Sequence, residues 1–172
     1  RVFSKWLSIL PLRLKLRILY FRRFYRLPNL VKPESFNEKL NWRKLHDYDP
    51  LLTIAADKIE SKKLVESVCP EVEIPKTLWA SDSFDDLPLD SLPSKYVLKA
   101  NHGSRMNLFI DDSHQPQIEQ LKAMLPSWMN HQQFNTLGER AYKNIVKRVF
   151  AEEFLEFAGT VPDDYKFFVY HG

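Results

Sequence analysis

The chain has 172 residues, of which 44% are hydrophobic and 27% charged, so it can form one folded domain and is not a disordered polyelectrolyte. Its single cysteine, Cys69, excludes a disulfide framework and a cysteine-based zinc site. The net charge of +3 is unevenly distributed, because residues 1–33 carry nine Lys or Arg, whereas all 22 acidic residues follow Pro33. This division argues against a uniformly basic nucleic-acid-binding protein.

Residues 1–33 form a basic leader, within which 12–26 are predicted to be helical. Apolar runs interrupted by Arg and Lys, without a small-residue cleavage site, exclude a secretory signal, and none approaches a membrane span. We therefore expect a cytoplasmic protein. Six aromatic residues alternate with the basic ones: Phe3, Trp6, Tyr20, Phe21, Phe24 and Tyr25. This mixture suits contact with an anionic membrane or glycan, for example at the inner face of a membrane. The alternative is a helix that packs its aromatics on the domain.

Residues 34–73 read as a helical region. Ser35 and Glu38 have capping-box spacing, which predicts a helix to about His46, followed by a turn at 47–50. A second helix is predicted over 57–68, with Asp57 as its N-cap. Lys58 follows this cap, where it would suit a bound phosphate together with the helix amides. The alternative is a solvated lysine beside its own aspartate.

Residues 74–172 mix strands with helices, so the predicted fold class is α+β. Strands are expected at 74–80, 96–100, 108–110, 146–155 and 165–170, with a loop at 82–93. A helix is expected over 118–128, with a break at Pro126. Since the last strand pattern stops at Gly172, we expect its partner strand to follow in a longer protein.

Lys99 lies within an apolar strand and directly before the polar loop 101–107. Strand alternation places Tyr96, Leu98 and Ala100 on one face and Lys99 on the other. A lysine at a strand end, followed by the Asn-His-Gly-Ser sequence that includes His102, suits a phosphate site, although the loop is not a Walker motif. The alternative is an edge-strand lysine that prevents aggregation.

Two further segments carry charged residues at strand ends. Glu152 and Glu153 precede Phe154 and Leu155, a segment whose backbone can read an adenine edge while a carboxylate binds ribose. Solvated surface acids are the alternative reading. Residues 163–166 place two carboxylates and the Lys166 ammonium at another predicted strand. The histidines show no metal-ligand spacing, and no Gly-x-Ser-x-Gly elbow is present.

Taken in order, these segments resemble the TupA-like branch of the ATP-grasp superfamily, named for teichuronopeptide biosynthesis. The matching segments are PESFNEKLNW at 33–42, ADK at 56–58, LP at 92–93, YVLKANHGS at 96–104, EEFL at 152–155 and DDYKFF at 163–168. The resemblance covers roughly residues 30–172. It implies a helical region at 34–73 and the nucleotide-facing part of an ATP-grasp domain at 74–172.

The resemblance also implies roles for individual residues. Lys58 and Lys99 would be the two nucleotide lysines, and the loop with His102, Gly103 and Ser104 would cover the phosphates. The segment Glu152, Glu153, Phe154 and Leu155 would bind adenine and ribose. Lys166 and Asp164 would face phosphate or the acceptor. Arg105 stands where family loops often have a further glycine. It would supply charge in the transition state, or else the loop would be stiffer and its nucleotide role altered.

The implied activity is ATP-dependent ligation of a carboxylate to an amine in cell-surface polysaccharide synthesis, with a saccharide or amino-acid acceptor. Its magnesium ligands are expected beyond Gly172, so residues 1–172 alone are expected to be inactive. Two alternatives remain open. One is a glycan kinase or glycosyltransferase-like enzyme on the same fold, and the other is a non-catalytic module that binds a membrane or glycan.

Overall fold

The computed structural model describes residues 6–7, 9–156, 163, 165–167 and 169. Its helices are α2 (Leu12–Phe24), α3 (Phe36–His46), α4 (Pro50–Ala56), α5 (Glu60–Val68), α6 (Ile118–Met129) and α7 (Gln133–Leu137), with 3-10 turns η1 (Leu89–Ser91) and η2 (Arg140–Tyr142). Its strands are β1 (Thr77–Ser81), β2 (Tyr96–Ala100), β3 (Asn107–Ile110) and β4 (Val149–Glu153). The fold class is α+β, as the sequence predicts.

The four strands form one antiparallel sheet in the order β1-β4-β2-β3. Strand β2 is central, because Leu98 lies opposite Ala151 of β4 on one side and Leu108 of β3 on the other. Lys99 therefore cannot be an edge-strand lysine that blocks aggregation, and that alternative is wrong.

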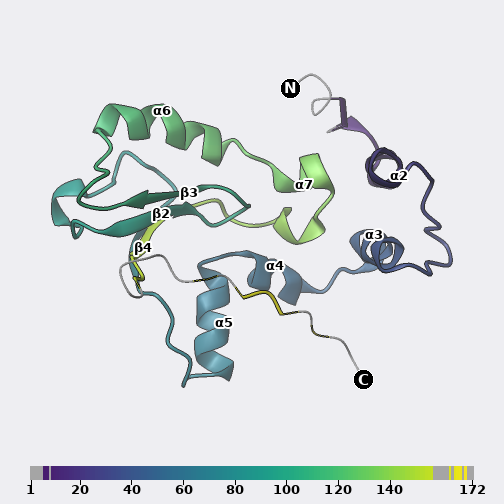
Figure 1. Cartoon of the computed structure of the whole chain (residues 1–172), viewed down its shortest axis with the longest axis horizontal. Coiled ribbons are helices and arrows are strands. Elements are labelled where there is room, and N and C mark those ends of the chain that lie inside the picture. Colours follow the sequence, from purple (N-terminus) through teal and green to yellow (C-terminus); the bar gives the residue numbers. More distant parts are fainter. Residues whose placement is uncertain (1–5, 8, 157–162, 164, 168, 170–172) are drawn as a thin grey trace.

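The hydrophobic core lies between the sheet and α6 (Figure 1). Tyr96, Leu98 and Ala100 of β2 pack there with Leu121 and Leu125 of α6, as alternation along the strand predicts. Lys99 is thereby directed to the opposite face, which is approached by α5. The sheet thus separates an apolar face from a charged one.

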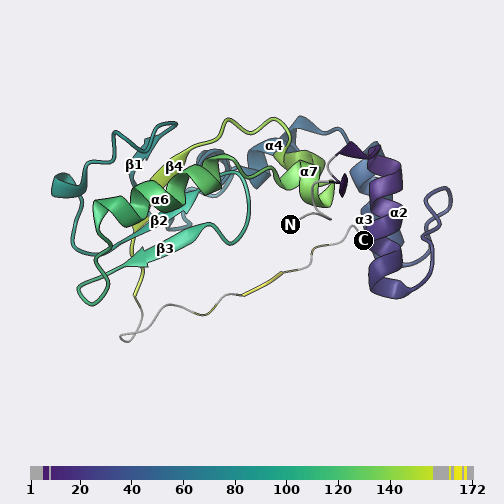
Figure 2. The ribbon, with the colours of Figure 1, turned by 90° about the horizontal axis from the view of Figure 1, so that it is seen from above.

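Helices α2 and α3 pair at one end of the molecule, beyond α7 as seen from the sheet (Figures 1 and 2). The predicted capping box is present, since Ser35 accepts from the Glu38 amide and Glu38 accepts from the Ser35 amide. Buried Glu38 also accepts hydrogen bonds from Arg26 and from the Asn29 amide, at 2.9 and 3.1 Å. One carboxylate therefore holds together the whole α2–α3 connection.

The leader helix is fixed to the domain at α7. Gly138 ends α7 in the left-handed conformation, with φ of 68°, and a Cβ on it would lie 2.6 Å from Leu12 Cδ1 and 3.2 Å from Leu16 Cδ2. Only glycine allows this approach of α2. Buried Lys15 donates to the Asn135 carbonyl at 2.8 Å, which adds a polar contact.

Several predicted boundaries are wrong for identifiable reasons. The segment read as a turn at 47–50 leads into α4, because Asp49 accepts from the Leu51 amide and Pro50 occupies the first helical turn. Helix α6 continues through Pro126 to Met129, since Leu125 and Trp128 on either side are buried. Helix α7 and turn η2 have no counterpart among the predicted elements.

The remaining strands are shorter than predicted. The segment 74–80 becomes β1 at 77–81, and 146–155 becomes β4 at 149–153. Of the predicted strand over 165–170, residues 165–167 and 169 are irregular, while 168 and 170 lie outside the described residues. That prediction is wrong for the described part, which has no neighbouring strand with which to form a ladder.

Candidate functional site

Lys99 and Glu152 form an ion pair on the sheet face opposite α6. They project from the neighbouring central strands β2 and β4, where Lys99 lies opposite Phe150 and Val97 opposite Glu152. Glu152 is only 6% exposed, so it is not one of the solvated surface acids of the alternative reading. A buried carboxylate requires partners, and Lys99 supplies one.

Lys62 of α5 supplies the second partner, and sequence reasoning missed it. Its ammonium lies 2.6 Å from the other Glu152 oxygen and donates to the Pro75 carbonyl at 2.6 Å. It also lies 5.5 Å from the centre of the Phe150 ring. The only local signal is its position four residues after Lys58, and the contact itself depends on tertiary packing.

Lys58 joins α5 to the loop that follows β2. Its ammonium donates to the Ala100 carbonyl at 2.8 Å and to the Gly103 carbonyl, and its amide donates to the Asn101 carbonyl at 3.2 Å. Burial, followed by the nearby Lys99 charge, lowers the pKa of Lys58. Lys58 is therefore half-buried and bonds the start of α5 to the loop, so it is not the solvated lysine of the alternative reading.

The Asp57 carboxylate accepts from the amides of Ile59 and Glu60 at 2.8 and 3.2 Å, as an N-cap side chain does. The regular helix α5 begins at Glu60, later than predicted. The Lys58 amide is already used by Asn101, so it is not one of the helix amides expected to hold phosphate. Together, Lys58, Lys62, Lys99, Glu152 and the loop 101–107 are called the lysine–Glu152 site below.

Asn101 holds the base of this loop and has no exposed surface. Its amide nitrogen donates to Asp57 and to the Val146 carbonyl, both at 2.9 Å, and its oxygen accepts from the Arg148 amide at 2.8 Å. His102 is also buried and lies 2.9 Å from the Trp128 carbonyl through Nε2. Burial lowers the pKa of His102, and the positive charges of Lys147, His131 and Lys58 act in the same direction. His102 therefore attaches the loop to the end of α6.

The tip of the loop has a different character. Gly103 is buried, with space for a Cβ limited by Met106 and His131, whereas Ser104 and Arg105 are exposed. Arg105 adopts a φ of 61°, in the left-handed region that favours glycine. A left-handed backbone at this position is consistent with the further glycine expected here in the family, because glycine adopts it without strain. The exposed tip is the part of the loop that a ligand can reach.

The segment after β4 begins beside this pair of strands. Glu153 is exposed and accepts from the Lys76 amide at 3.2 Å, as a surface acid would. Phe154 packs edge-to-face on Phe109 of β3 with ring centres 6.0 Å apart, and Leu155 is exposed. The predicted adenine-reading segment therefore lies at the end of the strand that carries Glu152.

The structure does not bring Lys166 into this group. Lys166 is exposed, and the described ribbon around it runs apart from the sheet (Figures 1 and 2). Asp164 lies outside the described residues. Neighbouring Asp163 is described and exposed.

Comparison with protein-family models gives one match, TupA-like ATP-grasp, over residues 38–172. The chain belongs to this family. The match contains every residue of the lysine–Glu152 site and begins after the basic leader. Comparisons with curated proteins and with solved structures found no match.

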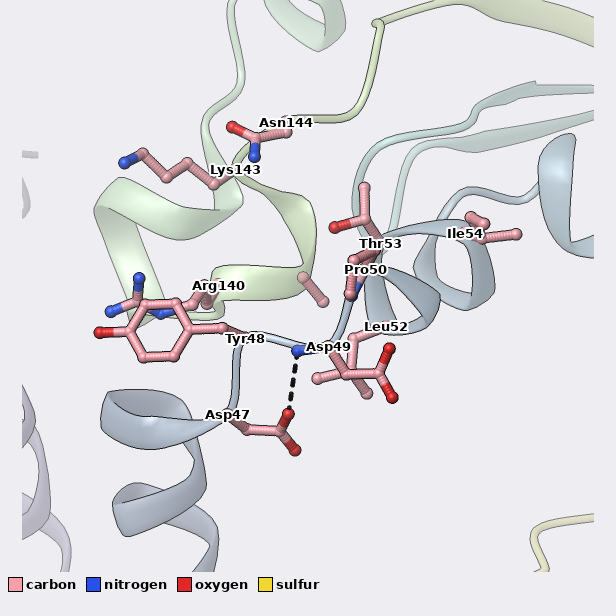
Figure 3. Close-up of a pocket in the computed structure, with 11 residues that line it drawn as sticks. Asp47, Tyr48, Asp49, Pro50, Leu52, Thr53, Ile54, Arg140, Lys143 and Asn144 are labelled. Atoms are coloured by element: carbon pink, nitrogen blue, oxygen red, sulfur yellow. Dashed lines mark hydrogen bonds between the residues drawn. The ribbon is translucent and has the colours of Figure 1, made fainter.

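The TupA-like ATP-grasp chain has a separate hollow of about 410 Å³ between α4 and η2 (Figure 3). Tyr48 forms one side, and the Arg140 guanidinium lies 4.2 Å from the centre of its ring. Asp47 accepts from the Asp49 amide at 3.2 Å and is paired with Arg43, while Asp49 caps α4. Its charged groups are thus engaged in joining α3, α4 and η2.

Neither a metal site nor a membrane span is found in the described part of the TupA-like ATP-grasp chain. No three His, Cys, Asp or Glu side chains gather as a ligand set among the described residues. Each helix within those residues is too short or too polar to cross a bilayer.

Proposed function

We propose that this ATP-grasp protein binds ATP at the lysine–Glu152 site. Lys99 and Arg105 would contact the phosphates, with Ser104 and the Gly103 backbone beside them. The segment 152–155 would receive adenine and ribose. The observation that carries the proposal is the Lys99–Glu152 pair on the sheet face opposite α6. Lys99 stands directly before the loop 101–107, whose tip is exposed.

The charge balance of the site supports a polyanionic ligand. Three ammonium groups, those of Lys58, Lys62 and Lys99, lie near two carboxylates, those of Glu152 and Asp57. Since phosphate oxygens accept charge-assisted hydrogen bonds from such groups, a triphosphate would offset the excess positive charge. The structure supplies no matching ligand set for Mg²⁺ in its described part, so we assign no residue to the metal.

The reaction that we propose is carboxylate–amine ligation. ATP supplies the phosphoryl group that converts a substrate carboxylate into an acyl phosphate, which an amine then attacks with release of phosphate. Lys99 and Arg105 would stabilise the charge that develops on the transferred group. Lys166 would take part only if its segment moved towards the sheet.

The acceptor that we propose is a saccharide or amino acid used for cell-surface polysaccharide, which places the enzyme in the cytoplasm against the inner face of a membrane. A glycan kinase or glycosyltransferase-like reaction on the same fold is the second candidate. The products separate the two, because a ligase releases phosphate only with an amine acceptor, whereas a kinase leaves a phosphorylated glycan.

Isothermal titration calorimetry with ATP and Mg²⁺ tests the nucleotide site. We expect Lys99→Met to weaken ATP binding at least tenfold. A tenfold change in affinity corresponds to about 1.4 kcal/mol, and the loss of one charge-assisted hydrogen bond to phosphate costs more than this. Lys122→Met on α6, an exposed lysine on the helix that covers the opposite sheet face, is the matched control and should bind normally. Unchanged binding by the Lys99 variant would contradict the assignment.

A further inference from the structure

The leader helix α2 presents one face that consists only of arginine and apolar side chains. Arg13, Leu14, Arg17, Phe21 and Phe24 are all exposed and fall within one arc of the helix. Elsewhere on the helix Lys15, Leu16 and Tyr20 are buried against the protein, while Arg22 and Arg23 are exposed. Of the aromatic residues of α2, Tyr20 therefore packs on the domain, as the alternative reading expects, whereas Phe21 and Phe24 are exposed and available for contact with a partner.

The apolar part of this surface is large for solvent-exposed residues. Leu14 and Phe21 are 46% and 48% exposed. Large apolar residues that flank α2 are exposed as well, with Trp6 and Ile9 before the helix and Tyr25 and Leu27 after it. Exposed apolar surface of this extent marks an interaction site rather than an ordinary protein surface.

The charge of the same surface identifies the partner. Residues 6–33 contain seven Lys or Arg and no acidic residue, and of these seven only Lys15 is buried, and Arg26 is paired with Glu38. Lysine and arginine around a row of Leu, Phe and Trp match the interfacial helices that lie in anionic bilayers, with aromatic rings at the headgroup level. A protein partner with this complementarity would need an acidic and an apolar surface together, whereas an anionic bilayer offers both over any area.

The position of α2 permits such contact. It lies with α3 at one end of the molecule, away from the sheet that carries the lysine–Glu152 site (Figure 2). A bilayer against the exposed arc of α2 would leave that site in solution. We propose that the Arg13–Leu14–Arg17–Phe21–Phe24 face of α2 docks the protein on an anionic membrane surface.

Vesicle co-sedimentation tests this docking with the full protein. We expect binding to phosphatidylcholine vesicles that contain phosphatidylglycerol, little binding to phosphatidylcholine alone, and loss of binding at high salt. Trp6, which is 66% exposed, should shift its fluorescence to shorter wavelength on binding. Equal binding to both vesicles, or binding to neither, would overturn the proposal.

Two variants and one control separate docking from folding. Arg13→Gln/Arg17→Gln should lower the partition coefficient at least tenfold, since each arginine near an anionic surface contributes several-fold, and Leu14→Ser/Phe21→Ser should lower it similarly. Lys63→Gln/Lys122→Gln removes the same charge from exposed sites on α5 and α6 and should bind as the wild type does. An equal loss in this control would overturn the assignment to α2, as would a stable dimer in ultracentrifugation that fails to bind vesicles. Each variant should retain ATP binding, so a failure of docking is distinguishable from a failure of the nucleotide site.

Discussion

Asp57 accepts a 2.9 Å hydrogen bond from Asn101 Nδ2, and both side chains are buried. This bond joins the turn before α5 to the base of the loop after β2. Lys58, directly after Asp57, reaches the loop, and Lys62 in the first turn of α5 reaches Glu152. This polar contact between segments far apart in sequence thus helps to position the lysine–Glu152 site, together with the bonds of Lys58 and Lys62.

We expect Asn101→Ala to lower the free energy of unfolding by about 2–3 kcal/mol, because it removes the side chain that bonds buried Asp57 Oδ2, the Val146 carbonyl and the Arg148 amide. Urea denaturation measures the change. Exposed Asn144→Ala is the matched control and should change stability by less than about 0.5 kcal/mol. Equal effects of the two substitutions would show that the Asn101 contacts contribute little.

Glu152→Ala should lower the free energy of unfolding by about 3 kcal/mol, since it leaves the Lys62 and Lys99 ammonium groups facing each other without a carboxylate. The neighbouring Glu153→Ala removes an exposed carboxylate and should cost about 1 kcal/mol or less. Adding Lys99→Met to Glu152→Ala should restore part of the loss, which a double-mutant cycle measures. Strict additivity would argue against the ion pair.

Glu38 should make stability depend on pH in the acid range. Hydrogen bonds from the Ser35 and Asn29 amides, together with Ser35 and Arg26 side chains, lower the pKa of Glu38 from 4.5 to about 2. Because the folded-state pKa is the lower one, the stabilisation is complete above pH 4.5 and is lost as the pH falls towards 2.

Urea denaturation of wild type and Glu38→Gln at neutral and acid pH measures this contribution. The difference between the two proteins should be largest at neutral pH and should shrink as the solution is acidified. Glu34→Gln, at a neighbouring exposed position, should run parallel to wild type. A Glu38→Gln difference that stays constant across the acid range would contradict the role of the carboxylate charge.

Pro126→Ala should stabilise the protein by about 1–3 kcal/mol. Proline within α6 has no backbone N–H to donate a helical hydrogen bond, and its ring clashes with the carbonyl of the preceding turn. The substitution leaves the buried Leu125 and Trp128 in place. Thermal denaturation measures the gain, and a lower melting temperature would mean that the proline ring makes a packing contact that outweighs its helical cost.

Local signals predicted the elements that local interactions build. Ser35 and Glu38 specify the start of α3 by their own hydrogen bonds, and alternation along β2 separates Leu98 from Lys99. Asp49-Pro50 was ambiguous, because the same residues that form a turn also begin a helix. Burial of Leu125 and Trp128 overrode the breaking tendency of Pro126, which no local pattern can measure.

The candidate site was predictable only where its residues lie in a continuous motif. Lys99 and the loop after it stand together in sequence, and Glu152 begins a second motif. Lys62 and Asn101 acquire their contacts from the packing of α5 against β4 and of the loop against Val146 and Arg148. Such contacts depend on the register of distant segments, so spacing alone did not indicate them.

The absence of a side chain at Gly138 fixes how α2 is oriented relative to the rest of the protein. Leu12 and Leu16 rest against this position, and Lys15 is bonded to the Asn135 carbonyl, so α2 has a defined angle to the body of the protein. A bilayer touching the outer arc of α2 would then fix the tilt of the whole domain above the lipid. A bulkier residue at 138 would push α2 away from α7, so the angle between α2 and the domain would no longer be fixed. Contact of α2 with a bilayer would then no longer set the orientation of the lysine–Glu152 site.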